Sequence, residues 1–201
     1  GNFGIVTKFL FRLHTMDPMV INFGFSFPMD VAKDALKLYF DFSTGADKDL
    51  FLLGGISMRE DGAGGVSIGG NYFGPQRNVD RALQPLRDFG KAIRDSVFPI
   101  EYVKIQQVAD DGFNAPGNRH YAKGGFLREV NDDLITTLIE RIEPLASRRF
   151  SVGLLPMDGA PSKVGAKDTV WAHRDAAYNI DSSSKWAVNN SDVDEENIAW
   201  N

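Results

Sequence analysis

Hydrophobic and polar residues alternate most clearly between Met19 and Phe27. Four large apolar residues on one side of this stretch alternate with mostly small or polar residues on the other: Ile21, Phe23, Phe25 and Phe27 against Val20, Asn22, Gly24 and Ser26. A period of two predicts a strand with one buried face. Pro28 then begins a helix, because its missing N–H costs little in the first turn. Apolar residues recur at helical spacing from Val31 to Phe42.

The rest of the chain is read by the same periodicities and by its turn residues. Strands are expected at 5–14, 49–59, 66–73, 98–108, 150–155 and 177–186, and helices at 78–89, 131–145 and 192–198. From residue 19 to residue 108 the order is strand, helix, strand, strand, helix, strand, which is the split βαβ arrangement of ferredoxin-like folds. The expected fold class is therefore α+β: an antiparallel sheet with helices packed on one face.

Composition excludes several classes of protein. The chain has 201 residues, with 22 Lys and Arg against 27 Asp and Glu, a net charge of −5 that argues against nucleic-acid binding. The absence of Cys excludes disulfides, Cys-ligated zinc, iron–sulfur clusters and thiol catalysis. No apolar run reaches the roughly 18 residues of a membrane span. No signal-peptide pattern is present, which favours a cytoplasmic location without identifying the compartment.

The common ligand motifs are missing. The glycines between Gly54 and Gly70 fit neither GxGxxG nor a P-loop, so they predict turns and close packing rather than a phosphate cradle. His14, His120 and His173 lie far apart in the sequence, so no metal site is expected.

Polar residues on expected strands are better candidates for a binding site. Three pairs each share one face of an extended segment by parity: Tyr102 with Gln106, Tyr121 with Lys123, and Asn179 with Asp181. Converging side chains of this kind can form a ligand wall. They can equally form the solvent-facing side of an antiparallel sheet, and parity does not decide between the two.

Two longer motifs resemble a known family. The segment Gly1-Asn2-Phe3-Gly4-Ile5-Val6-Thr7, followed by Phe11-Arg12-Leu13-His14, resembles GGGGNFGIVT…FRLH of FAD-linked oxidases of the berberine bridge enzyme-like group, within the vanillyl-alcohol oxidase superfamily. His173-Arg174-Asp175-Ala176, with Tyr178 and Trp186, resembles the HRDA.Y…W stretch of the same group. Weaker matches follow in the same order at 74, 82–86, 102–106, 119–123 and 158–160.

The resemblance implies a division of the chain and a cofactor. Residues 1–14 would be the end of an FAD-binding domain with its crossover strand, and residues 15–201 a substrate-binding domain truncated before the C-terminal Tyr-x-Asn motif. The pyrophosphate loop and the FAD-attachment His would lie in a preceding domain, so the chain is expected to be a fragment whose partner is that missing domain. The residues along the flavin would be Asn2, Phe3, Gly4, Ile5 and Val6, mostly through their backbone.

The resemblance also implies roles for the polar strand residues. Asp181 is the candidate to assist or orient the catalytic base, the alternative being a structural hydrogen bond to a neighbouring strand. The substrate wall would consist of Tyr102, Gln106, Tyr121, Lys123 and Asn179. Three positions depart from the family pattern: Asp158-Gly159 stands for Gly-Gly, Trp171-Ala172 for Phe-Pro, and Gly124 for Ser.

Two functions of different classes follow. In the first, the parent protein oxidises an alcohol, a sugar or a related small molecule by hydride transfer to flavin, with oxygen as the acceptor. This chain without its cofactor would then be inactive. In the second, the chain is a stand-alone module that binds a small molecule or a protein without chemistry. If the chain is a fragment, the face intended for the flavin domain would be exposed and could support a homodimer.

Overall fold

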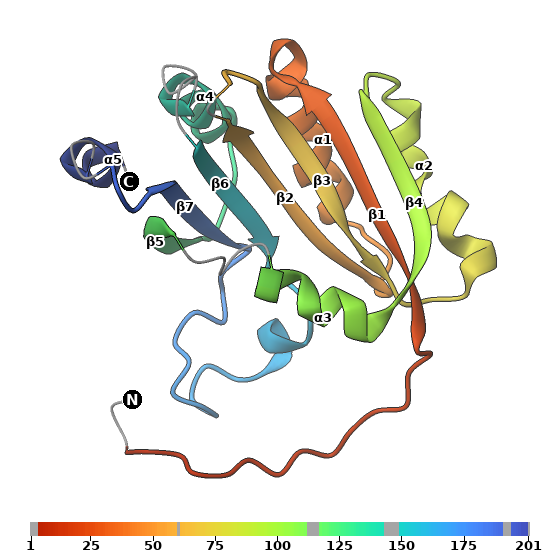
Figure 1. The fold of residues 1–201 in the computed structure, drawn as a ribbon. Coiled ribbons are helices and arrows are strands. Elements are labelled where there is room, and N and C mark those ends of the chain that lie inside the picture. The colour runs from red at the N-terminus through yellow and green to blue at the C-terminus, as the bar shows by residue number, and fades with distance from the viewer. Residues whose placement is uncertain (1–3, 60, 112–116, 143–148, 191–193, 201) are drawn as a thin grey trace.

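The computed structural model describes residues 4–59, 61–111, 117–142, 149–190 and 194–200. Within them, antiparallel strands form one sheet in the order β4-β1-β3-β2-β6-β7-β5 (Figure 1). The strands are β1 (Met19–Pro28), β2 (Leu50–Met58), β3 (Gly64–Tyr72), β4 (Arg94–Glu101), β5 (Asn118–Leu127), β6 (Arg149–Pro156) and β7 (Tyr178–Ala187). The helices are α1 (Ala32–Ser43), α2 (Val79–Asp88), α3 (Tyr102–Asp111), α4 (Asp132–Ile142) and α5 (Asp194–Trp200), with short 3-10 turns at Met29–Val31, Gln76–Asn78 and Ala160–Lys163.

The first half of the chain has the predicted topology. The order β1-α1-β2-β3-α2-β4 folds into strands arranged β4-β1-β3-β2, the ferredoxin-like arrangement. β6 then adds to the free edge of β2, and β7 and β5 extend the sheet further. The α+β class with an antiparallel sheet is confirmed.

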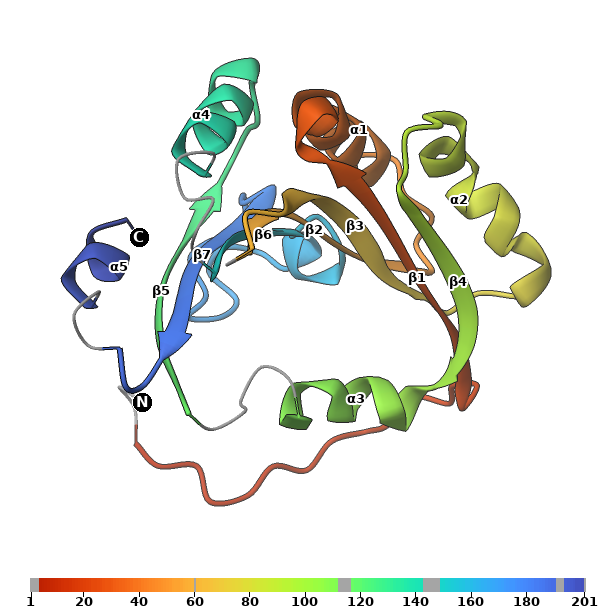
Figure 2. The same cartoon turned by 45° about the horizontal axis from the view of Figure 1, so that its top comes forward.

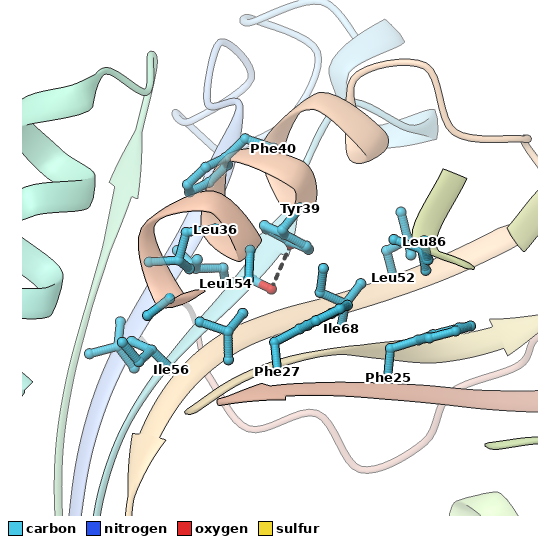
Figure 3. Packing of buried hydrophobic residues seen from close by; sticks show 14 of the residues in the cluster. Phe25, Phe27, Leu36, Tyr39, Phe40, Leu52, Ile56, Ile68, Leu86 and Leu154 are labelled. Atoms are coloured by element: carbon cyan, nitrogen blue, oxygen red, sulfur yellow. Dashed lines mark hydrogen bonds between the residues drawn. The ribbon is translucent and has the colours of Figure 1, made fainter. Parts of the chain in front are cut away.

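The core lies between the sheet and the helices α1, α2 and α4. Phe23, Phe25 and Phe27, the apolar face of β1, are almost fully buried beneath these helices. Tyr39 of α1 is also buried, and its hydroxyl donates to the Leu154 carbonyl at 2.9 Å (Figure 3). This bond satisfies the one polar atom that the ring brings into the core.

The opposite face of the sheet, called the open face below, carries the alternate residues of each strand. Figure 2 shows α1, α2 and α4 along one side of the curved sheet, while α3 and the N-terminal segment lie on the other, concave side. The residues of β1 on this face, Asn22, Gly24 and Ser26, are half-buried. No helix in the described residues is long and apolar enough to cross a membrane.

One expected strand is absent, and another ends earlier than predicted. Residues 4–17 form no strand or helix, and Ile5 and Leu10 are 93% and 94% exposed. Their composition favours a strand, but both edges of β1 are already paired, with β3 and with β4. A strand needs a neighbour for its backbone groups, and residues 4–17 pair with none of the strands in the described part of the chain.

The strand expected at 98–108 also ends early. β4 stops at Glu101, opposite Met19 at the start of β1, and the last backbone bond runs from Tyr102 N to Pro18 O. Beyond this point β1 offers no further partner, and the chain turns into α3. Tyr102 and Gln106 still share a face because residues four apart do so on a helix. That face belongs to α3 and not to the sheet.

Candidate functional site

Strand register brings residues from all seven strands into one row across the open face. The row is mostly small, and it reads in sheet order Arg94, Ser26, Ser67, Gly55, Gly153, Asp181 and Gly124. Directly paired residues of antiparallel strands point to the same face. Asp181 is therefore a carboxylate with a glycine on each side of it in the sheet.

The glycine on β5 makes room for this carboxylate. A Cβ built on Gly124 would overlap Oδ1 of Asp181, so the carboxylate occupies the volume that a side chain at position 124 would need. A Cβ on Gly153 would meet only the Asp181 carbonyl oxygen, at 3.9 Å. The side chain of Asp181 is exposed, and among the described residues its carboxylate forms no hydrogen bond or ion pair. The alternative role, a structural hydrogen bond to a neighbouring strand, finds no partner in the described chain.

Asn179 lies on the same face as Asp181, two residues before it on β7. Its side-chain Nδ2 donates to the Gly125 carbonyl at 3.2 Å, which ties it to β5. Its partner in the register is Phe126. Asn179 therefore shares the open face with Asp181 while its amide helps to hold the edge strand.

An aromatic cluster stands beside this pair. Phe126 stacks on His173 with ring centroids 4.3 Å apart, and Trp171 packs edge-on to Phe126 at 5.2 Å. Trp171 and His173 belong to the segment between Ala160–Lys163 and β7, whereas Phe126 is on β5. Sequence reasoning missed Phe126 because no local pattern relates it to a loop some 45 residues away.

Two charged contacts hold the loop that carries His173. Arg128 Nε donates to Asp175 Oδ2 at 2.5 Å, and this hydrogen bond holds the pKa of the Asp175 carboxyl below its ordinary value of 3.8. Arg174 Nη1 donates to the Pro161 carbonyl at 2.9 Å. The Arg and Asp of the HRDA motif are thus engaged in contacts that position this loop.

The register separates Tyr121 and Lys123 from Asp181. Tyr121 pairs with Ser184 and Lys123 with Ser182, so both lie on the helix-covered face of the sheet. There Lys123 Nζ lies 5.7 Å from the Tyr121 ring centroid. The parity of this pair was predicted correctly, but the two residues do not share a wall with Asp181.

The other predicted residues lie outside the sheet. Tyr102 is half-buried at the start of α3, with its ring 6.0 Å from that of Phe73, and Gln106 is exposed on the same helix. Gly4, Ile5 and Val6 are exposed in the N-terminal segment. Asn2 and Phe3 lie outside the described residues. The expected contact of these five N-terminal residues with flavin stays a prediction.

The open face suits a flat ligand. The glycines beside Asp181 leave the strand backbone uncovered, and this allows a planar ring to approach closely. The open face therefore fits one side of a flavin ring. In the described residues, no three His, Asp or Glu side chains gather closely enough to hold a metal ion.

Comparison with known proteins defines the class of this fold. No family model matches the chain. An FAD-linked oxidoreductase of Dictyostelium discoideum is 25% identical over 183 residues, which cover 90% of this chain and 39% of that protein. The resemblance to FAD-linked oxidases that the sequence motifs indicated is confirmed.

Solved structures agree on the fold. A berberine bridge enzyme-like protein of Arabidopsis thaliana matches with a TM-score of 0.75 and 16% identity over 92% of this chain and 41% of its own. The carbohydrate oxidase of Microdochium nivale, solved with a substrate analogue, matches with a TM-score of 0.72 and 18% identity over 92% of this chain and 43% of its own. The chain therefore has the fold of one part of the berberine bridge enzyme-like oxidases, and it spans less than half the length of these proteins.

Proposed function

We propose that this chain is the substrate-binding part of an FAD-dependent oxidoreductase that oxidises an alcohol, a sugar or a related small molecule, with oxygen as electron acceptor. The observation that carries the proposal is the unpaired carboxylate of Asp181, exposed between glycines on the open face of a sheet shared with FAD-linked oxidases. Without the flavin-binding domain the chain is inactive, because the cofactor carries the difficult step.

The residues of this chain have separable roles in the proposed reaction. FAD, when bound, supplies the acceptor of the hydride. Oδ1 of Asp181 accepts the proton of the substrate hydroxyl, or orients the group that does so. Asn179 and the aromatic cluster bound the site on one side, and the backbone of residues 2–6 lies along the flavin. Gln106 and Tyr102 contribute from α3. Tyr121 and Lys123 have no place in the site, because they lie on the other face.

The test uses the full-length protein with its flavin domain. Asp181→Asn keeps the shape of the side chain and removes the proton acceptor, so anaerobic flavin reduction by substrate is expected to slow by about 100-fold. Asp133→Asn, an exposed aspartate on α4, is the matched control and leaves the rate unchanged. Equal rates for wild type and Asp181→Asn would remove Asp181 from the mechanism. A full-length protein that binds no flavin would instead favour the stand-alone binding module.

A further inference from the structure

Basic side chains gather at one end of the open face, beyond Asp181 along β7. Lys185 follows Asp181 by four residues on the same face and pairs with Arg149 of β6 and with His120 of β5. Arg59, next to the end of β2, completes a group called the basic end below. Four side chains that can carry positive charge thus meet from three strands and one turn.

A hollow of about 230 Å³ lies at the basic end. Its floor includes one serine from each of three adjacent strands, and these form a single row across the sheet: Ser57, Ser151 and Ser183. Serine hydroxyls can donate to an anion while the surrounding cations neutralise it. The hollow therefore combines hydrogen-bond donors with positive charge.

The four basic side chains of the basic end differ in the interactions that they already form. Arg59 Nη2 forms an ion pair with Asp61 at 2.6 Å. His120 and Lys185 each have an interaction of their own as well. Arg149 is exposed, and its side chain forms no ion pair or hydrogen bond with any described residue. Arg149 is therefore the residue whose planar guanidinium is available to a ligand, and a guanidinium matches the geometry of a carboxylate or a phosphate.

We infer that the basic end binds an acidic group, a carboxylate or phosphate, of the substrate whose oxidised carbon lies at Asp181. This inference rests on the proposed function. Same-face residues on a strand are about 7 Å apart, which puts Lys185 about 13 Å from Asp181. A single six-membered ring cannot span this distance. The inferred substrate is therefore an elongated molecule with its acidic group at the end away from the bond that is oxidised.

The first experiment tests the anion site without any redox chemistry. Inorganic phosphate is titrated into the full-length protein at constant ionic strength, and the backbone amides of Ser151 and Ser183 are followed by NMR. We expect saturating shifts at both amides. Arg149→Gln should weaken the binding by about fivefold. Arg94→Gln is the matched control, because it removes the same charge from an exposed arginine of the open face at the opposite edge of the sheet.

Two results would overturn the anion site. One is a set of chemical shifts that do not saturate as phosphate is added. The other is an equal weakening of phosphate binding by Arg149→Gln and Arg94→Gln. Either would mean that phosphate binding depends only on the net charge of the protein. Lys185→Gln is the second variant, to be used if Arg149→Gln loses the dispersed spectrum of the folded chain.

A second experiment connects the site to oxidation. In the full-length protein, KM is compared for two substrates that differ only in a terminal carboxylate or hydroxymethyl group. Arg149→Gln should raise KM about fivefold for the acidic substrate and leave the neutral one unchanged. Equal effects on both substrates would refute the inference. The two hypotheses can also fail separately. If phosphate binds as expected but Asp181→Asn leaves turnover unchanged, the proposed oxidation is overturned and the anion site is retained.

Discussion

The carboxylate of Asp181 lies where the side chain of residue 124 would be, and only a glycine at 124 leaves it room. The two residues are direct partners in the register of β5 and β7. The position of the candidate proton acceptor therefore depends on a residue on a different strand, far from it in the sequence.

Gly124→Ala should move the Asp181 carboxylate without unfolding the protein. Gly124 does not have a positive φ, and the atom in the way is the mobile end of an exposed side chain. We expect the free energy of unfolding to change by less than about 0.5 kcal/mol, while flavin reduction in the full-length protein slows. Gly125→Ala is the control, because its Cβ would meet only Ile180 Cγ2, at 3.9 Å. Equal reduction rates for the two variants would contradict this steric relationship.

Gly54→Ala should destabilise the core. A Cβ on Gly54 would overlap the ring of Tyr39, which is fully buried and cannot move aside cheaply. Overpacking of this kind reduces the free energy of unfolding by about 1–3 kcal/mol. Urea unfolding measures it, with Gly153→Ala as the control on the open face. Wild-type stability in Gly54→Ala would show that α1 can shift to accept a methyl group.

Tyr39 should make the fold sensitive to alkaline pH. Burial raises the pKa of its phenol far above the ordinary value of 10.0, so the hydroxyl stays protonated in the folded chain and ionises on unfolding. Its contribution to stability is complete below pH 10.0 and decreases as the pH rises above it. Urea midpoints between neutral and alkaline pH should therefore fall less steeply for Tyr39→Phe than for wild type.

The same variant has a second effect at neutral pH. Loss of the hydrogen bond to the Leu154 carbonyl should reduce the free energy of unfolding by about 1 kcal/mol. Tyr121→Phe, which removes the hydroxyl of a half-buried tyrosine of β5, is the control at neutral pH. If the urea midpoint of Tyr39→Phe falls with rising pH as steeply as that of wild type, Tyr39 is not the source of the sensitivity to alkaline pH.

Asn131 should stabilise the start of α4. Its Oδ1 accepts a hydrogen bond from the Leu134 backbone N–H at 2.9 Å, the geometry of a helix N-cap. Asn131→Ala should lower the free energy of unfolding by about 1 kcal/mol. Asn189→Ala, in an exposed loop, is the control, and equal midpoints in urea for both variants would rule out the cap.

Local patterns predicted much of the fold. The alternation of β1 and the helical spacing of α1 are properties of short segments, so the split βαβ order could be read without knowing any contact. The prediction failed at residues 102–108 and 5–14, where the composition favours a strand. In each case the outcome depended on whether the segment pairs with another strand of the folded sheet, and no short segment contains that information.

The candidate site divides in the same way. Parity along one strand places Asn179 with Asp181 and Tyr121 with Lys123, and the residues alone were sufficient for both pairings. Whether the two pairs face each other depends on the register between β5 and β7, and a shift of one residue exchanges the faces of a strand. Gly124, and not Lys123, lies opposite Asp181. The sequence by itself thus determined which side chains share a face of each strand. Only the tertiary structure decided which of these faces form one site, because that depends on backbone pairing across the folded sheet.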